Sequence, residues 1–238
     1  MKKILFASII LTVICNNLYA QNISIRGGFN LSNMLDKNDF ITTSDDYQAR
    51  PGFHFGGIID FPLSSNISLE TGILFTTKGY KYDRVFPAPS GSDELIIDGG
   101  PEGAEQETEA KIRTNLSYID IPLAGKVMYD LNGVKIYGLL GPYLGYGISG
   151  QQSGEEIVNG VTINEVTLEV SWGEAVGFKR FDYGLYMGAG VEINKFQIGI
   201  NYSLGLANIH VNPENDINPV QRNRVLGLIS IGYRIADL

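Results

Sequence analysis

The 238-residue sequence predicts an all-β protein, an eight-stranded antiparallel up-and-down β-barrel that spans a membrane. Three observations predict it. The chain begins like an exported protein, eight segments alternate apolar with polar or glycine residues, and the connections between these segments alternate between short and long.

The N-terminal residues 1–20 are interpreted as a secretory signal peptide. Met1-Lys2-Lys3 is basic, the apolar run Ile4–Cys15 follows, and Ala20 is a small residue suited to cleavage. The apolar run has about a dozen residues, whereas a helix needs roughly 20 to cross a bilayer. We therefore expect cleavage after Ala20 and a single barrel domain over residues 21–238.

Removal of residues 1–20 also changes the composition. It takes away the sole cysteine, Cys15, and two lysines, and leaves 16 basic against 26 acidic residues. This acidic balance excludes nucleic acid as an expected partner, because nucleic-acid binding needs clustered Lys and Arg. A lipoprotein signal that uses Cys15 is the alternative, but the bulky pair Val13-Ile14 precedes that cysteine and disfavours it.

Eight segments repeat a period of two residues. In the first, Ile23, Ile25 and Phe29 share one face, and Arg26 and Asn30 share the other. Each segment is near the 9–11 residues that a tilted membrane strand requires. The segments cover residues 22–31, 53–61, 67–75, 119–129, 134–148, 183–193, 196–206 and 225–235.

The lengths of the connections independently indicate a membrane barrel. Short ones follow the second, fourth and sixth segments at Pro62–Asn66, Asp130–Gly133 and Asn194-Lys195. Long ones follow the other segments at about Ser32–Arg50, Arg84–Lys111, Gly150–Arg180 and His210–Gln221. Outer-membrane barrels have short periplasmic turns and long outer loops, so the N-terminus of the mature chain is expected on the short-turn side.

Aromatic residues on the apolar face lie near the strand ends, where an amphipathic ring suits the headgroup level. Phe61, Tyr129, Phe196 and Tyr233 are expected at the short-turn rim, and the loop rim is expected to carry Phe29, Phe53, Tyr146 and Tyr183. A soluble lipocalin-like barrel is the alternative, because its strands alternate too. In that alternative the apolar face, which begins at Val225 on the eighth segment, turns inward, and charged residues such as Arg26 and Glu70 are exposed.

The polar face is expected to fill the lumen, since eight strands leave room only for side chains. We predict a network of paired charges there, because buried charges are costly unless paired. The predicted network is formed by Arg26, Glu70, Asp120, Lys126, Glu192 and Arg234. The same parity places further polar residues inside, namely Asn30, Lys78, Lys135, Asp182, Gln197 and Asn201. A gated ion path along these charges is the alternative.

The candidates for chemistry are few. His54 and His210 are the two histidines, and neither is followed two residues later by serine, as in the lipid A deacylase barrels. We predict no catalytic residue, no cofactor and no metal site. Pro122 and Pro142 lie inside predicted strands, and a bulge or a local loss of pairing is expected near each, because proline lacks a ladder donor.

The outer loops differ in composition. Acidic residues between Arg84 and Ala110 are dispersed among Gly and Pro, which is typical of a solvated loop, with calcium binding as the alternative. By contrast, residues 157–163 have the turn pair Asn159-Gly160 between β-branched residues. With Val166–Trp172 they predict strands that form a hairpin beyond the membrane. Trp172 is expected as a rim anchor or as a partner contact.

The chain resembles the PorT-like outer-membrane β-barrel domain family. The likeness covers nearly all of the mature chain and is carried by Ile25–Leu31, Leu69–Phe75, Tyr118–Leu123 and Gly227–Arg234. The resemblance implies the bacterial outer membrane, contact with its lipid, and a role in protein secretion in one branch. We expect a monomeric, non-enzymatic barrel that presents loops or docks envelope partners. An accessory secretion component and a lipid-modifying enzyme are the alternatives.

Overall fold

The computed structural model describes residues 21–37, 46–87, 107–173, 177–211 and 220–237, so the predicted signal peptide lies outside them. Among these residues, no helix is long and apolar enough to cross a membrane. The described strands are β1 (Asn22–Lys37), β2 (Tyr47–Gln48), β3 (Arg50–Pro62), β4 (Ile67–Pro87), β5 (Glu107–Leu131), β6 (Val134–Val158), β7 (Val161–Glu169), β8 (Phe181–Ile193), β9 (Phe196–Gly205) and β10 (Val220–Asp237).

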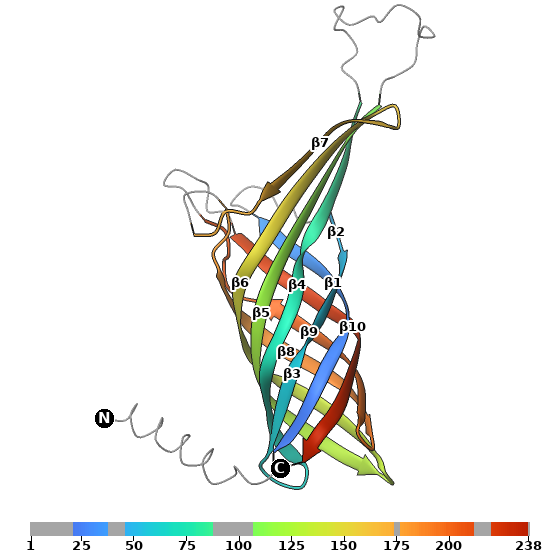
Figure 1. Ribbon diagram of the computed structural model, residues 1–238, viewed down its shortest axis with the longest axis vertical. Helices are drawn as coiled ribbons and strands as arrows, with labels where there is room; N and C mark the ends of the chain where they lie inside the picture. Colours follow the sequence, from blue (N-terminus) through green and yellow to red (C-terminus); the bar gives the residue numbers. More distant parts are fainter. Residues whose placement is uncertain (1–20, 38–45, 88–106, 174–176, 212–219, 238) are drawn as a thin grey trace, which may run out of the picture.

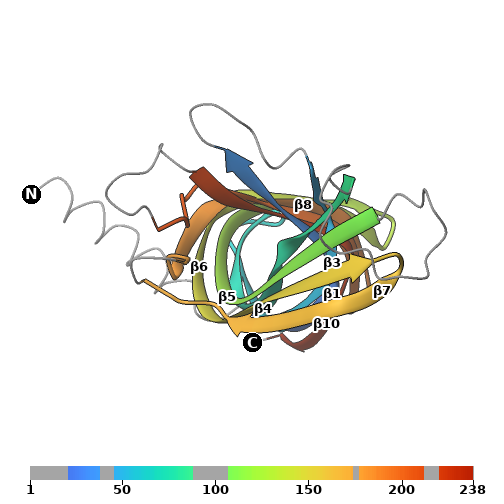
Figure 2. The same cartoon turned by 90° about the horizontal axis from the view of Figure 1, so that it is seen from above.

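Eight of the strands form a closed antiparallel ring (Figure 1, Figure 2). β1 pairs with β3 on one side and with β10 on the other, and the order continues through β4, β5, β6, β8 and β9 back to β10. The first and last strands meet from Asn22 opposite Asp237 to Lys37 opposite Val220. The prediction of an eight-stranded antiparallel barrel is confirmed. β2 and β7 lie outside this ring and pair with β4 and β6.

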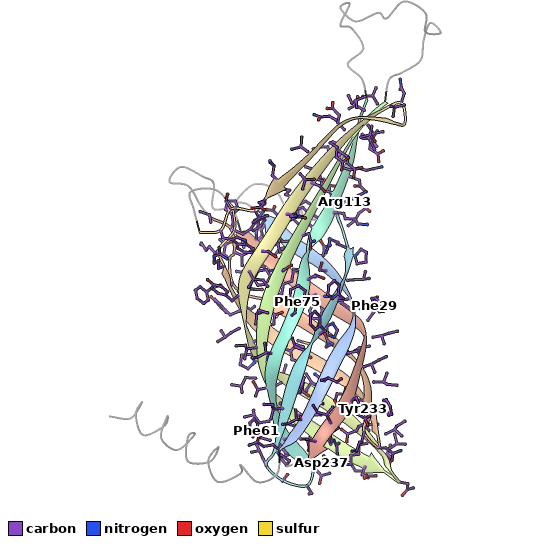
Figure 3. The ribbon with its side chains drawn as sticks, viewed as in Figure 1. Phe29, Phe61, Phe75, Arg113, Tyr233 and Asp237 are labelled. Carbon is purple, nitrogen blue, oxygen red and sulfur yellow. The ribbon has the colours of Figure 1, made fainter. Side chains whose placement is uncertain are left out.

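The ring has an apolar outside and a polar inside. On β1, Ile25 and Phe29 are 56% and 71% exposed, whereas Arg26 and Asn30 are buried. In Figure 3 the side chain of Phe29 projects away from the barrel wall. The soluble alternative required the apolar face to turn inward, and the structure excludes it.

The short connections have the conformations that their sequences predict. Asn132 and Gly133 join β5 to β6 with φ of 54° and 95°, and Asn194 joins β8 to β9 with φ of 55°. Left-handed backbone of this kind suits two-residue turns, whose twist matches that of the strands. Figure 1 places these turns at the end of the barrel where Asp237 lies in Figure 3, so the start of β1, opposite Asp237, and the end of β10 share the short-turn side.

The two strand prolines lie beside an interruption of the ladder, as predicted. Pairing between β5 and β6 stops after Pro122 opposite Tyr143 and resumes at Gly125 opposite Leu140 in the same register. The interrupted part contains Pro142, which has no N–H to donate. On the other edge of β5, the Thr71 hydroxyl donates to the carbonyl of Pro122 at 2.7 Å and replaces part of the missing pairing.

For one residue, the predicted side of the barrel wall is wrong. Val225 was assigned to the lipid face of the eighth segment, but its side chain is 3% exposed and faces the lumen. The cause is a shift of register, since Phe29 lies opposite Ile229 and the next residue, Asn30, lies opposite Gly227. A bulged residue reverses the parity of the strand beyond it, so Leu226 faces outward in place of Val225.

The long connections also need correction, because much of them is strand. β4 runs to Pro87, β5 begins at Glu107, β6 runs to Val158, and β7 follows after the turn. These strands continue past the ring as the outer sheet, which we define as residues 79–87, 107–116, 151–158 and 161–169 (Figure 1). Beyond the hydrocarbon a strand needs no long apolar face, so the strand continuations 79–87 and 107–116 were not predicted, whereas the hairpin within 151–169 was.

The hairpin predicted at residues 157–163 is confirmed. β6 and β7 pair from Gln151 opposite Glu169 to Val158 opposite Val161. Asn159 and Gly160 form the turn with φ of 51° and 78°. Figure 1 shows β7 on the outer side of β6 and away from the ring.

Candidate functional site

The lumen contains two separate groups of charges. The group nearer the short turns is built around Arg26, whose guanidinium donates to Glu70 Oε1 at 2.6 Å and to Glu70 Oε2 at 2.8 Å. Lys126 lies 3.4 Å from the same carboxylate and 3.3 Å from Asp60. All four side chains are buried, so each charge depends on its neighbours for compensation. We define the inner cluster as Arg26, Asp60, Glu70, Lys126, Glu192, Gln197 and Arg234.

The inner cluster continues to the last strands of the ring. Arg26 donates to Gln197 Oε1 at 3.2 Å, and Gln197 donates to Glu192 Oε2 at 2.9 Å. Arg234 on β10 forms an ion pair with Glu192 on β8. The structure therefore brings together five of the six residues of the predicted network, Arg26, Glu70, Lys126, Glu192 and Arg234.

The sixth, Asp120, belongs to a second group, the outer cluster. Lys78 is fully buried and lies 2.9 Å from Asp120 and 3.0 Å from Asp182. Asp182 also accepts hydrogen bonds at 3.0 Å from Tyr143 and from Asn223. The Lys78 ammonium lies 4.4 Å and 4.9 Å from the ring centroids of Tyr118 and Tyr143, so aromatic faces complete its surroundings.

Several members of these clusters were not predicted. Asp60 shares the face of His54 on the second segment, and counting by parity along that strand was sufficient to find it. Asn223 lies beyond the bulge of β10, where parity changes, and so escaped the same count. Lys135, Asn201 and Arg234 are only partly buried, in contrast to the other residues assigned to the lumen.

A small cavity of about 20 Å³ lies in the lumen beside Asp120 and Tyr143 and reaches His54 and Asn201. It is about the size of one water molecule. His54 Nε2 lies 3.0 Å from Ser230 Oγ, and both side chains are buried. His210 is elsewhere, with Nδ1 3.3 Å from Gln221 Oε1. The histidine and serine in the lumen are thus adjacent, but the space beside them does not accommodate an acyl chain.

The outer mouth of the lumen is closed by an apolar cluster that was not predicted. Buried side chains from distant segments meet there, namely Met34, Tyr80, Leu116, Tyr118, Phe178, Ala207 and Ile209. Tyr47 of β2 stacks on Tyr80 with ring centroids 4.1 Å apart, and its hydroxyl donates to Asp36 at 2.7 Å. Burial, followed by Tyr80 and Asp36, raises the pKa of Tyr47 well above its ordinary value, so this phenol stays neutral. Trp172 packs against the cluster, 5.8 Å from Tyr118 between centroids.

The outer sheet has two unlike faces and a free edge. On one face Val166 and Leu168 of β7 are 45% and 61% exposed. On the other face Arg113, labelled in Figure 3, pairs with Glu155 at 3.1 Å. All nine residues of β7 are exposed, and among the described strands it pairs only with β6.

No group of three or more His, Cys, Asp or Glu side chains in the described ranges is arranged to hold a metal ion. The alternative of calcium binding concerned the acidic residues between Arg84 and Ala110. Of these, Asp93, Glu94, Asp98, Glu102 and Glu105 lie outside the described residues. Glu109 is described, and it lies 3.2 Å from Lys111.

Two solved structures are similar over nearly the whole chain at low identity. The attachment invasion locus protein Ail of Yersinia pestis is 15% identical, with 92% of this chain and 100% of that chain covered and a TM-score of 0.37. Neisserial surface protein A is 12% identical, with 90% and 97% covered and a TM-score of 0.35.

None of the curated proteins matches the chain. The model of the outer membrane protein β-barrel domain family matches residues 19–211, which is most of the sequence and includes seven of the eight ring strands. With the closed ring, its apolar outer face and its polar interior, this match establishes that the chain belongs to the outer membrane protein β-barrel domain family.

Proposed function

We propose that the protein is a non-enzymatic docking barrel, whose outer sheet binds an extended segment of an envelope protein by strand addition at β7. The observation that carries this proposal is the outer edge of β7, which pairs with no other described strand. An exposed edge strand presents a row of main-chain donors and acceptors, and extended peptides bind such edges in known recognition modules.

The direction of the free main-chain groups follows from one hydrogen bond. Val170 donates its N–H to the carbonyl of Gly150 on β6 at 3.0 Å. Main-chain groups alternate in direction along an antiparallel strand, so those of Leu168 also face β6, whereas Thr167 and Glu169 direct theirs away from it. A partner strand would therefore pair with Thr167 and Glu169.

The side chains favour one kind of partner. Val166 and Leu168 lie on the same face of β7 and remain exposed. A partner strand with apolar residues at alternate positions would cover them by cross-strand contacts. Glu165 and Glu169 alternate with these residues and favour a partner that carries basic side chains at the intervening positions.

The lumen supports a docking role over transport. The inner and outer clusters fill the interior with paired charges, and the apolar cluster closes the outer mouth. An eight-stranded ring leaves room for little besides side chains. The proposed function therefore depends on the outer surface of the protein.

The experiment is photo-crosslinking in cells from a photoreactive residue at position 168, with identification of the captured protein by mass spectrometry. Thr167→Pro removes an outward-facing N–H and leaves the ladder to β6 in place, since edge positions tolerate proline. We expect this variant to lose the captured protein and the matched control Thr167→Ala to keep it. Equal capture by both variants would rule out strand addition at β7.

The resemblance to the PorT-like family adds a more specific proposal, that the docked partner is a component of protein secretion. The same crosslinking experiment tests it, because the captured protein is identified. A secretion protein captured by wild type and lost in Thr167→Pro supports this role. A partner unrelated to secretion leaves the docking function in place and removes the secretion role.

A further inference from the structure

A cavity of about 710 Å³ lies in the barrel wall where β6 changes its neighbour from β8 to β7. β8 pairs with β6 as far as Tyr146 opposite Phe181, and β7 begins at Gln151 opposite Glu169. The polar side chains that line the cavity are those of Asn115, Ser117, Ser149, Gln151, Glu169, Ser171 and Arg180.

The strand register explains why these residues meet. Asn115 lies opposite Gln151, and Gln151 lies opposite Glu169, so three strands contribute one row of polar side chains. Ser117 lies opposite Ser149 in the next row. Thr114, Leu116 and Tyr118 are fully buried, so Asn115 and Ser117, which alternate with them, face outward. Small serine side chains in this row leave the wall hollow.

The cavity lies at the level of the lipid headgroups. On the same outward face, one row toward the short turns, Ile119 lies opposite Tyr146, and Ile121 lies opposite Leu144 in the row after. Phe181, opposite Tyr146, is 72% exposed, and Leu144 is 64% exposed, so the apolar surface begins at the row of Tyr146. The Arg180 guanidinium lies 5.8 Å from the Tyr146 ring centroid and marks the boundary between polar and apolar surface.

The chemistry of the lining selects a class of ligand. Carboxamides and hydroxyls both donate and accept hydrogen bonds, Glu169 accepts, and Arg180 donates, which matches the mixed donors and acceptors of sugar hydroxyls. The buried Oδ1 of Asn115 has no hydrogen-bond partner within the described structure. The Trp172 indole also lines the cavity and offers an apolar surface to a sugar ring. A polyanion is disfavoured because Arg180 is accompanied by Glu169, and an acyl chain is disfavoured by the polar lining.

We propose that this cavity binds the saccharide part of a glycolipid of the outer leaflet. A soluble oligosaccharide has the same chemistry. The position of the cavity favours the lipid-linked source, because its outward-facing residues Asn115 and Ser117 lie directly beyond the apolar outer surface. This site is separate from the free edge of β7, so it does not depend on the proposed docking function.

The test uses the full barrel in phosphatidylcholine nanodiscs. The probes are rough lipopolysaccharide and, separately, the core oligosaccharide released from it by mild acid. Trp172 is the sole tryptophan, so its fluorescence reports on the cavity directly, and native mass spectrometry counts the bound molecules. We expect saturable binding of both probes, with lipopolysaccharide at least about tenfold tighter because its acyl chains hold the sugar at the membrane.

Two variants and one control make the test specific. Gln151→Leu removes a central donor and acceptor and is expected to weaken binding of both probes about tenfold. Ser149→Phe fills the hollow and is expected to abolish binding. Ser153→Ala changes a serine on the same face of β6 outside the cavity, and binding should stay within about twofold of wild type. A gel shift on heating verifies that each variant folds. If Ser149→Phe does not fold, the result for Gln151→Leu alone decides the test.

Three outcomes would overturn the proposal. If neither probe binds, the cavity is not a saccharide site. Binding that both cavity variants leave unchanged shows that the probe contacts another surface. Equal affinity for released oligosaccharide and lipopolysaccharide assigns the cavity to a soluble saccharide and removes the glycolipid.

Discussion

Arg26 and Glu70 join two strands that do not pair with each other. Two parallel hydrogen bonds, 2.6 Å and 2.8 Å long, connect β1 to β4 behind the intervening β3. Because both side chains are buried, each compensates the desolvation of the other, and Lys126 shares the same carboxylate at 3.4 Å.

Removal of Glu70 is therefore expected to destabilise the barrel strongly. Glu70→Ala leaves Arg26 and Lys126 without their shared carboxylate and should lower the free energy of unfolding by about 3–5 kcal/mol. The measurement is urea unfolding in lipid vesicles. Glu155→Ala breaks an exposed ion pair with Arg113 and serves as the control, with an expected cost of about 0–1 kcal/mol. Equal costs for the two variants would show that the buried pair contributes little.

The lipid-facing isoleucines should reject charge. Ile200 is 57% exposed on the outer face of β9, and Ile200→Arg near the bilayer midplane should cost about 2–4 kcal/mol. Asn201→Arg on the opposite face should be milder. Spin labels on cysteines at positions 198 and 201 give the direct readout. Oxygen dissolved in the bilayer should relax the label at 198 and spare the one at 201, and equal relaxation would contradict the assignment of the faces.

The closed lumen predicts an absence of steady ion current. The apolar cluster lies over the outer cluster, in which Lys78 is held by Asp120 and Asp182, so no continuous water path is expected along these side chains. Planar-bilayer recordings of the purified barrel test this, with a porin in the same bilayer as the positive control. Reproducible unitary current steps would establish a conducting state.

The histidines are not expected to act on lipid. His54 contacts Ser230 beside a cavity of about 20 Å³, which is too small for an acyl chain. Mass spectra of lipid A should therefore be the same for cells with wild type, His54→Ala, His210→Ala and no barrel. A lipid species that depends on either histidine would establish a lipid-modifying enzyme.

The predicted signal peptide has a direct test. The protein purified from outer membranes should begin at Gln21, because Ala20 precedes the expected cleavage site. An intact-mass measurement distinguishes a protein that begins at Gln21 from one that retains residues 1–20. A lipid-modified Cys15 at the N-terminus would support the lipoprotein alternative instead.

The ring was predictable from the sequence because its determinants are local. Alternation along single strands and turn pairs such as Asn132-Gly133 depend on neighbouring residues, and both agree with the structure. Parity could not predict that the side chain of Val225 faces the lumen, because the bulge that reverses the parity depends on how β1 and β10 pair. The continuation of β5 back to Glu107 was missed because strands outside the membrane need no apolar face.

The partners within the lumen were harder to predict than its polarity. Parity placed Asp120 inside the barrel, but its partner Lys78 depends on the stagger between β4 and β5. The apolar cluster required Met34, Phe178 and Ile209 to meet from three connections, and no local pattern in these segments signals that meeting.

An ion pair and a hydrogen bond from β10 link the interior to the completion of the ring. Arg234 reaches Glu192, and Asn223 reaches Asp182, so the last strand supplies groups that two acids of β8 require. Until β10 is in place beside β9, these acids remain without those partners, and water must solvate them. An unfinished sheet therefore gains little from entering the hydrocarbon, and the polar interior makes insertion and closure a single cooperative step.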